Sequence, residues 1–131
     1  MEVFSLVAQV LGVTRSDSVT GDGVGFTAQT STGPQSARSL RQAIEIVRRD
    51  LGSFLQRAER SGVPWGLRVS VGAVSAVYGE FPGFPGSPSA VDRSSPVVRI
   101  RSQWHDGQGP LAALENALRI VEAYAGRRAA A

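Results

Sequence analysis

Apolar residues recur at spacings of three and four in two long segments, the pattern of an amphipathic helix. The first segment is bounded by Gly33-Pro34 and Gly62, and the second begins at Gly109-Pro110 and ends at Gly126. Proline is tolerated in the first turn of a helix, and glycine adopts the left-handed conformation that often ends one. The apolar positions are Ala37, Leu40, Ile44, Val47, Leu51, Phe54 and Ala58 in the first helix, and Leu111, Leu114, Leu118, Val121 and Ala125 in the second.

Three other segments alternate apolar and polar residues, as strands with one buried face do. They are residues 24–30, residues 98–104 and a valine-rich region at 67–78 that Gly72 is expected to bend or break. The N-terminal segment, residues 3–12, fits two patterns. Its valine content favours a strand, which is the prediction adopted, but Val3, Leu6, Val7, Val10 and Leu11 also fall on one helical face.

These elements predict an α+β fold, in which a two-layer sandwich has a mainly antiparallel sheet of about 4–5 strands and two long helices on one face. With 131 residues, the chain has the length of a single domain, residues 1–131. A shift of 74 positions places residues 24–52 over 98–126 with 8 identities in 29 positions. This similarity indicates a duplicated ββα unit with repeats at 1–62 and 63–131, and the alternative is an ordinary α+β sandwich with similar junctions.

A long Pro/Gly loop, residues 79–96, interrupts the second half. It contains the tripeptide Phe-Pro-Gly twice in succession, so Phe81 and Phe84 lie among prolines and glycines. Exposed phenylalanines favour association, and we therefore expect them to cover a pocket or to contact a second subunit or partner. The alternative is a loop that folds back on its own surface.

Composition excludes several kinds of chemistry. All 14 basic residues are arginine, cysteine is absent, and His105 is the one histidine. Schiff-base and P-loop chemistry both need lysine, and thiolate catalysis needs cysteine. A site of two or three imidazoles is likewise impossible within one chain. Carboxylates alone could bind a metal, but no EF-hand pattern is present, and no metal or cofactor is expected. The net charge of +3 is too small to indicate nucleic-acid binding by itself.

The apolar fraction of 42% fits a globular chain, and the near-apolar run from Val3 to Val13 is too short to span a bilayer. The acidic start Met1-Glu2 does not resemble a signal peptide. A cytoplasmic location without membrane contact is the resulting expectation.

The turn before the second helix contains candidate site residues. Trp104, His105 and Asp106 come first, and Gly107 and Gly109 follow. The histidine could act as a general acid or base beside the aspartate, and the glycines could bring backbone amides close to an anion. The alternative is that the tryptophan is core, the histidine is solvated, and the glycines and Asp106 only turn the chain.

Arg99 and Arg101 alternate along one predicted strand, and Arg68 could join them from a neighbouring strand. An arginine stripe suits phosphate or an acidic partner. No aromatic residue alternates with these arginines, so the stacking platform typical of RNA-binding sheets is missing, and an ordinary solvated face is the alternative.

The segment from Gly107 to Leu118, GQGPLAALENAL, resembles the strand-to-helix junction of the leucine-sensing regulatory domain of 2-isopropylmalate synthases, where a Gly-x-Gly-Pro turn enters a helix. Residues 31–38 resemble the other junction of that duplicated domain. The order of the junctions is reversed, Ala112 replaces the usual acidic residue, and the Phe-Pro-Gly insertion has no counterpart. The resemblance implies a dimeric domain that senses a small molecule.

The sequence therefore predicts a non-catalytic interaction module that forms a homodimer or binds a protein partner through the 79–96 loop and the adjacent sheet face. One alternative is nucleic-acid binding through the arginine-lined strand, and another is a small-molecule enzyme with His105 and Asp106 in its pocket. The candidate contacts are Phe81, Phe84, Arg99, Arg101, Trp104, Gly107 and Gly109.

Overall fold

The computed structural model describes residues 1–79, 98–99 and 109–130. Its elements are β1 (Glu2–Val10), β2 (Val13–Gly21), β3 (Phe26–Thr30), β4 (Gly33–Ala37), α1 (Leu40–Ser61), β5 (Trp65–Val71), β6 (Val74–Gly79), β7 (Val98–Arg99) and α2 (Pro110–Ala130). The strands form one sheet in the order β4-β3-β2-β1-β5-β6-β7. All neighbours are antiparallel except β6 and β7, which are parallel.

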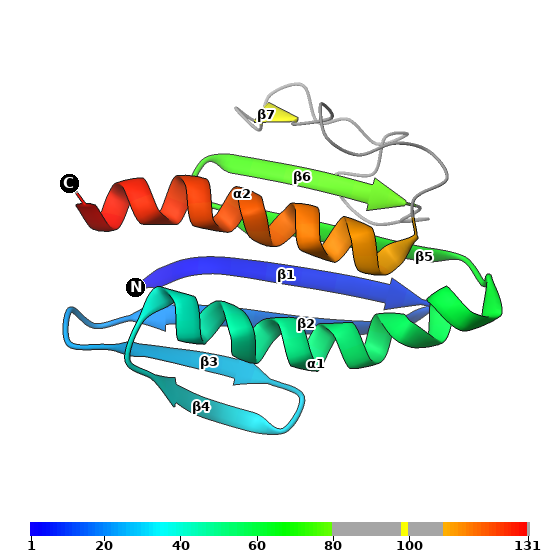
Figure 1. Cartoon of the computed structure of the whole chain (residues 1–131), viewed down its shortest axis with the longest axis horizontal. Coiled ribbons are helices and arrows are strands. Elements are labelled where there is room, and N and C mark those ends of the chain that lie inside the picture. The colour runs from blue at the N-terminus through cyan, green and yellow to red at the C-terminus, as the bar shows by residue number, and fades with distance from the viewer. Residues whose placement is uncertain (80–97, 100–108, 131) are drawn as a thin grey trace.

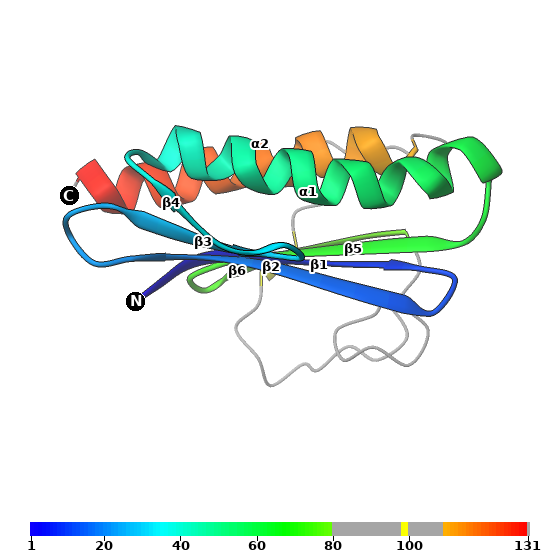
Figure 2. The ribbon, with the colours of Figure 1, turned by 90° about the horizontal axis from the view of Figure 1, so that it is seen from below.

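Both helices lie side by side on one face of this sheet, as Figure 1 and Figure 2 show. The predicted α+β class, with a mainly antiparallel sheet and two helices, is confirmed. The predicted number of strands is too low, because the described residues form a seven-stranded sheet. The described first half has four strands before its helix and the second half has three, so the duplication stays a prediction.

The hydrophobic core lies between the sheet and the helices. The N-terminal segment is a strand, as predicted, and its alternate residues Phe4, Leu6, Ala8 and Val10 are buried under the helices. The helix α1 contributes the buried residues Ala43, Ile44, Val47, Leu51, Phe54, Leu55 and Ala58. The predicted apolar stripe is thus largely confirmed.

A two-residue turn, Leu11-Gly12, connects β1 to β2, because Val10 pairs with Val13. Both turn residues have positive φ, 51° at Leu11 and 80° at Gly12. This geometry matches the type I′ hairpin turn, whose preferred first residue is asparagine or aspartate. A leucine in this conformation is sterically strained by about 1 to 2 kcal/mol.

We therefore expect Leu11→Asn to stabilise the protein by about 1 kcal/mol, because asparagine tolerates the left-handed conformation. The side chain of Leu11 is 67% exposed, so its removal should cost little packing. Urea denaturation of the two proteins measures the difference. A variant less stable than the original chain would show that the leucine makes contacts that outweigh its backbone strain.

The predicted start of the first helix is wrong. Residues Gly33–Ala37 form the edge strand β4, and α1 begins at Leu40 after its N-cap Ser39, whose hydroxyl accepts a hydrogen bond from the Gln42 amide at 3.1 Å. A proline is acceptable in an edge strand, because one side of that strand needs no partner. The predicted end is confirmed, since Gly62 adopts φ 68° and ψ 19°.

Other boundaries also differ. Val24 lies in the turn before β3 and is 94% exposed, so that strand begins two residues later than predicted. The valine-rich region is two strands joined at Gly72, as expected. The helix α2 begins at Pro110, as predicted, but continues beyond Gly126 to Ala130.

Strand β7 accounts for residues 98–99 of the strand predicted at 98–104, and residues 100–104 lie outside the described residues. Gly79 closes β6, and the rest of the predicted 79–96 loop also lies outside them.

Candidate functional site

The sheet face opposite the helices is lined with small polar side chains. Side chains alternate along a strand, so the positions between the core residues belong to this face. We call it the outer face; its described positions on the four central strands are Ser5, Val7, Gln9, Thr14, Ser16, Ser18, Thr20, Arg68, Ser70, Ser75 and Val77. Hydroxyl side chains predominate in this set.

Serines from four adjacent strands fall into one row across the outer face. Ser5 on β1 pairs with Ser18 of β2 on one side and with Ser70 of β5 on the other, and Ser70 pairs with Ser75 of β6. Neighbouring strands lie about 4.8 Å apart, so the row places hydroxyls at regular short intervals. We call these four residues the serine row. All but Ser75, which is 5% exposed, are at least partly accessible.

The structure separates the predicted arginine stripe. Arg68 lies on the outer face, with Val7 and Val77 as its register partners. Residue Arg99 takes the register position opposite Ser75, and β6 lies between its strand and that of Arg68. The two arginines therefore belong to strands that are not neighbours, contrary to the expected arrangement.

A pair of carboxyl groups lies between the sheet and α1. The sequence patterns did not predict this pair. Asp17 of β2 is 1% exposed, and its register partner Leu6 is a core residue. Its oxygens have no hydrogen-bond donor among the described residues as long as both carboxyls are ionised. Asp50 of α1 faces it, so a proton on Asp17 can form a hydrogen bond between the two carboxyls.

The environment holds that proton on Asp17. Burial, the hydrogen bond to Asp50 and the negative charge of Asp50, in that order of size, together raise the pKa of Asp17 to about 8, against the opposing charge of Arg15. Partial burial pushes the pKa of Asp50 upward as well. Hydrogen bonds from Asp17 and Ser31 outweigh this effect, so the pKa of Asp50 remains below its usual value. At neutral pH the pair therefore shares one proton.

Ser31 fixes the position of the Asp50 carboxylate, and the charge of Arg15 acts on both acids. The Ser31 hydroxyl donates to Asp50 at 2.5 Å and the Ser31 amide donates to the same carboxylate at 3.2 Å, which ties the β3–β4 turn to α1. The guanidinium of Arg15 lies 4.9 Å from the centre of the Phe54 ring, a cation–π distance. Asp17 is thus enclosed by β1, β2 and α1, and this arrangement suits a buried structural acid better than a group that meets substrate.

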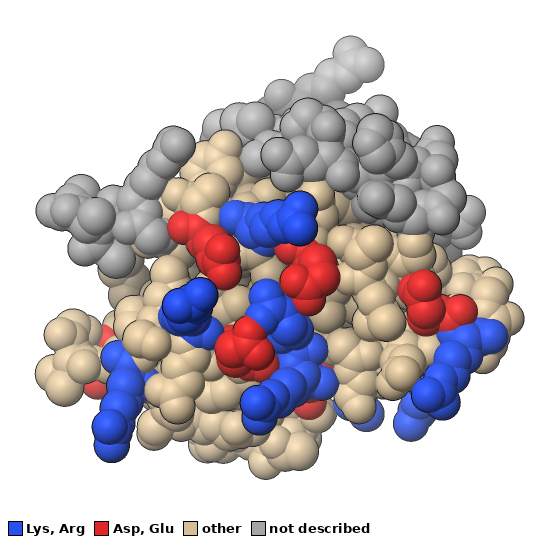
Figure 3. Space-filling model, in the orientation of Figure 1, with Lys and Arg blue, Asp and Glu red and all other residues tan. Residues whose placement is uncertain are grey.

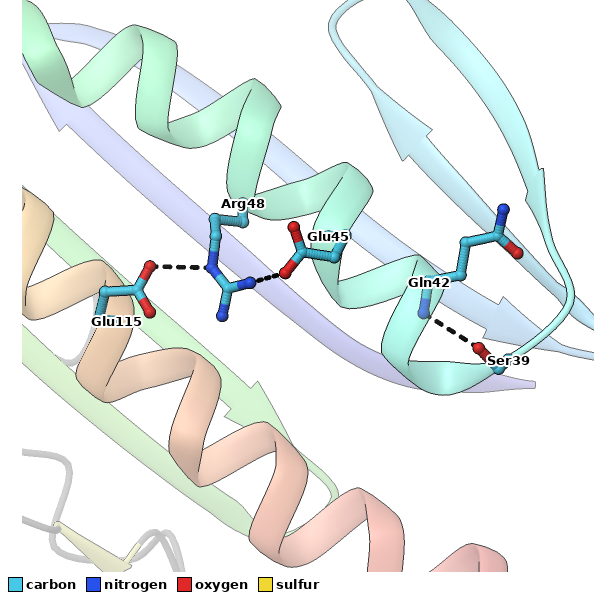
Figure 4. Close-up of polar contacts among 5 residues, drawn as sticks. All are labelled: Ser39, Gln42, Glu45, Arg48 and Glu115. Carbon is cyan, nitrogen blue, oxygen red and sulfur yellow. Dashed lines mark hydrogen bonds and ion pairs between the residues drawn. The ribbon is translucent and has the colours of Figure 1, made fainter.

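The helices are held to each other and to the sheet by polar contacts. Figure 4 shows Arg48 of α1 between two acids, Glu45 on its own helix and Glu115 of α2, with 2.8 Å from the Arg48 Nε to the Glu115 carboxylate. These groups are partly exposed, so the contact adds little stability. Below them, the Tyr78 hydroxyl donates to Asn116 at 2.8 Å in the core. Burial raises the pKa of Tyr78 to about 12, so it stays protonated.

The predicted anion site before the second helix has an internal carboxylate beside it. Glu59 of α1 accepts a hydrogen bond from the Leu111 amide at 3.4 Å, in the first turn of α2. A Cβ at Gly109 would lie within 3 Å of this carboxylate, so the glycine permits the close approach. This contact brings the last part of α1 close to the start of α2.

An apolar cavity of about 300 Å³ opens at the end of the sheet where β1 begins. It is lined by Met1, Glu2, Val3, Gly21, Gly23, Phe26, Leu40 and Ala125, which come from β1, both ends of the β2–β3 connection, and the facing ends of the two helices. We call it the end cavity. Its lining is mostly apolar, and none of these positions was predicted from the sequence as a candidate site residue.

The helix side of the molecule has mixed charge. Figure 3 shows acidic and basic side chains interspersed over this side, with no region of one sign. A shallow depression on α1 is lined by Ser39, Arg41, Gln42, Glu45, Ile46 and Arg49. The mixture of signs fits an ordinary solvated surface.

Most of the predicted site residues lie outside the described part of the chain. These are Phe81, Phe84, Arg101, Trp104, His105, Asp106 and Gly107, so the enzymatic and nucleic-acid alternatives stay predictions. Within residues 1–79, 98–99 and 109–130, no three acidic or histidine side chains gather as metal ligands would. Neither α1 nor α2, over the same residues, combines the length and apolar content needed to cross a bilayer.

Comparison of the chain with protein-family models, with curated proteins and with solved structures finds no match. The resemblance of the Gly107–Leu118 segment to a regulatory domain therefore gains no support.

Proposed function

We propose that this protein is a non-catalytic interaction module that forms a homodimer through the outer face of its sheet, with the 79–96 segment adjoining that face. The serine row is the observation that supports this proposal. A serine hydroxyl both donates and accepts hydrogen bonds, so a row of them is complementary to a second copy of itself. A twofold dimer requires this self-complementarity, because the same patch meets itself.

The small size of most side chains on the outer face also favours face-to-face packing of two sheets. Figure 2 shows that α1 and α2 cover the helix-facing side. The outer-face side chains of β1, β2 and β5 are mostly small, with Gln9 and Arg68 as the long ones. Small side chains let two sheets approach closely, and Val7 and Val77 supply apolar area beside the serine row.

The test is Ser5→Arg, because Ser5 lies at the middle of the serine row. In a twofold dimer the substitution would bring two cations together and separate the sheets, so sedimentation velocity should show a dimer for the original chain and a monomer for the variant. Ser5→Thr keeps the hydroxyl and should remain dimeric. The matched control is Ser53→Arg on the exposed surface of α1, which should leave the dimer intact.

A monomeric original chain at millimolar concentration would refute the proposal, as would a Ser5→Arg variant that still dimerises. The double substitution of Phe81 and Phe84 by serine measures the contribution of the 79–96 segment in the same assay. Weaker dimerisation of this variant would place that segment in the interface.

A further inference from the structure

The exposed large hydrophobic side chains of the described residues fall at the two opposite ends of the sheet. Leu11 and Val13, 67% and 57% exposed, lie at the β1–β2 turn. Met1 and Val24, 83% and 94% exposed, lie at the other end, beside the end cavity. One end of the sheet thus has protruding apolar side chains, and the other end has an apolar cavity, so the two ends are complementary in shape and polarity.

The protruding end consists of Leu11, Gly12 and Val13, which we call the hairpin tip. Its position is fixed by the Leu11 amide, which donates to the Pro64 carbonyl at 3.3 Å beside the end of α1. Leu11 has the strained positive φ described above, although asparagine or glycine would fit the turn without strain. A strained backbone that displays an exposed leucine indicates that the leucine side chain has a role outside its own chain.

The end cavity has a size that suits the hairpin tip. Its volume of about 300 Å³ equals the liquid volume of about ten waters. The side chains of Leu11 and Val13 together contain fewer than ten carbon atoms, so their combined volume is smaller than that of the cavity and both fit. Val3, Phe26, Leu40 and Ala125 provide the apolar contacts that such side chains would exchange for water.

The two features cannot meet within one molecule. Strand β1 runs from Glu2 to Val10, so the end cavity and the hairpin tip are separated by its whole length, about 30 Å at 3.3 Å per residue. Figure 1 shows the N-terminus and the β1–β2 turn at opposite ends of the strand. The hairpin tip can therefore enter only the end cavity of another copy.

We propose that copies of this chain associate head to tail, with the hairpin tip of one copy inserted in the end cavity of the next. Such a contact is heterologous, because different surfaces meet, and it leaves one tip and one cavity free at the ends of every assembly. The association can therefore continue beyond two copies, unlike the twofold dimer proposed above. The buried patch is small, so the contact is expected to be weak and to depend on concentration.

The absence of cysteine makes the geometry directly testable. Two single variants are prepared, Leu11→Cys at the hairpin tip and Val24→Cys beside the end cavity, and one of them carries a tag. A short bis-maleimide should link the tagged and untagged chains in an equimolar mixture more efficiently than it links either variant alone. Ser53→Cys, on the exposed surface of α1, replaces Val24→Cys as the matched control and should show no preferential linking.

A second measurement uses unlinked protein. In the Ser5→Arg background, which removes the proposed sheet dimer, sedimentation at rising concentration should still show association. Leu11→Asn should weaken this association by about tenfold or more, because hot-spot side chains dominate small interfaces. Leu11→Met keeps an apolar side chain of similar size and should retain it. Because Leu11→Asn is expected to be more stable, a loss of association cannot be attributed to unfolding.

The head-to-tail contact would be overturned if the reagent linked only two copies of Leu11→Cys to each other and never Leu11→Cys to Val24→Cys. A chain that remains monomeric at the highest soluble concentration in the Ser5→Arg background would also overturn it. To isolate the end-to-end contact, both experiments are carried out in the Ser5→Arg background, so either result leaves the sheet-dimer proposal to be judged by its own assay.

Discussion

Replacing Asp17 with asparagine should stabilise the protein at alkaline pH, by about 5 kcal/mol near pH 9, and should change its stability near pH 4 very little. The carboxyl is 1% exposed and faces Asp50, so its ionised form is both desolvated and repelled. The new amide cannot ionise, and it donates to Asp50 as the protonated acid does. Asparagine therefore preserves the native contact at every pH.

The sign of the pH dependence follows from the two pKa shifts. The pKa of Asp17 rises from 3.8 to about 8 on folding, so its favourable contribution is complete below pH 3.8 and is lost as the pH rises through 8. The pKa of Asp50 is lowered, so its contribution is present above the unfolded pKa and is lost in strong acid. Thermal unfolding of the original chain should consequently occur at a lower temperature at pH 9 than at pH 5.

The matched control is Asp22→Asn. Asp22 is an exposed turn acceptor, and its carboxylate receives the Val24 and Gly25 amides at 2.8 and 2.9 Å. These hydrogen bonds lower its pKa, so its removal cannot relieve an alkaline loss of stability. An original chain with equal melting temperatures at pH 5 and pH 9, or an Asp17→Asn variant that melts earlier at pH 9, would contradict the shared proton.

Gly79→Ala should destabilise the protein by about 3 kcal/mol or more, the second large effect expected. Gly79 ends β6 with φ of 70°, and a Cβ there would lie 2.5 Å from the Trp65 carbonyl oxygen and 3.0 Å from its ring. The backbone of β5 would have to move, because the clashing oxygen belongs to a strand. Guanidinium denaturation measures the loss.

Gly62→Ala separates the two causes of that loss. Gly62 has nearly the same φ, 68°, but a Cβ there would meet nothing within 4 Å. Only the backbone strain applies, so we expect a cost of about 1 kcal/mol. Equal losses of stability for the two variants would show that Trp65 moves aside at little cost and that its close approach to Gly79 does not affect the free energy of unfolding.

Local patterns predict the elements of this fold wherever a strong apolar period or a helix-ending glycine exists. Leu51 and Phe54 fall on the buried face of α1, and Gly62 ends it as expected. The start of the helix could not be predicted, because Gly33-Pro34 is equally suited to an edge strand. What decides between the two is the pairing of β4 with β3, a contact that periodicity does not report.

Strand β2 and the carboxyl pair were missed for a single reason. On the helix-facing side of this strand, Arg15 and Asp17 occupy positions that in most half-buried strands are apolar. The alternation of apolar and polar residues therefore disappears, and the segment resembles a polar loop. The buried carboxyl becomes evident only when Asp50 is placed above it by the packing of α1.

The place of β1 in the middle of the sheet has a consequence for how the chain folds. Its partner β2 follows immediately, but its other partner β5 begins at Trp65, after the whole of α1. During synthesis, the first four strands and α1 can assemble while one edge of β1 still lacks its neighbour. An open strand edge is a template for pairing with other chains, so we expect the nascent protein to be most vulnerable to aggregation until β5 has left the ribosome.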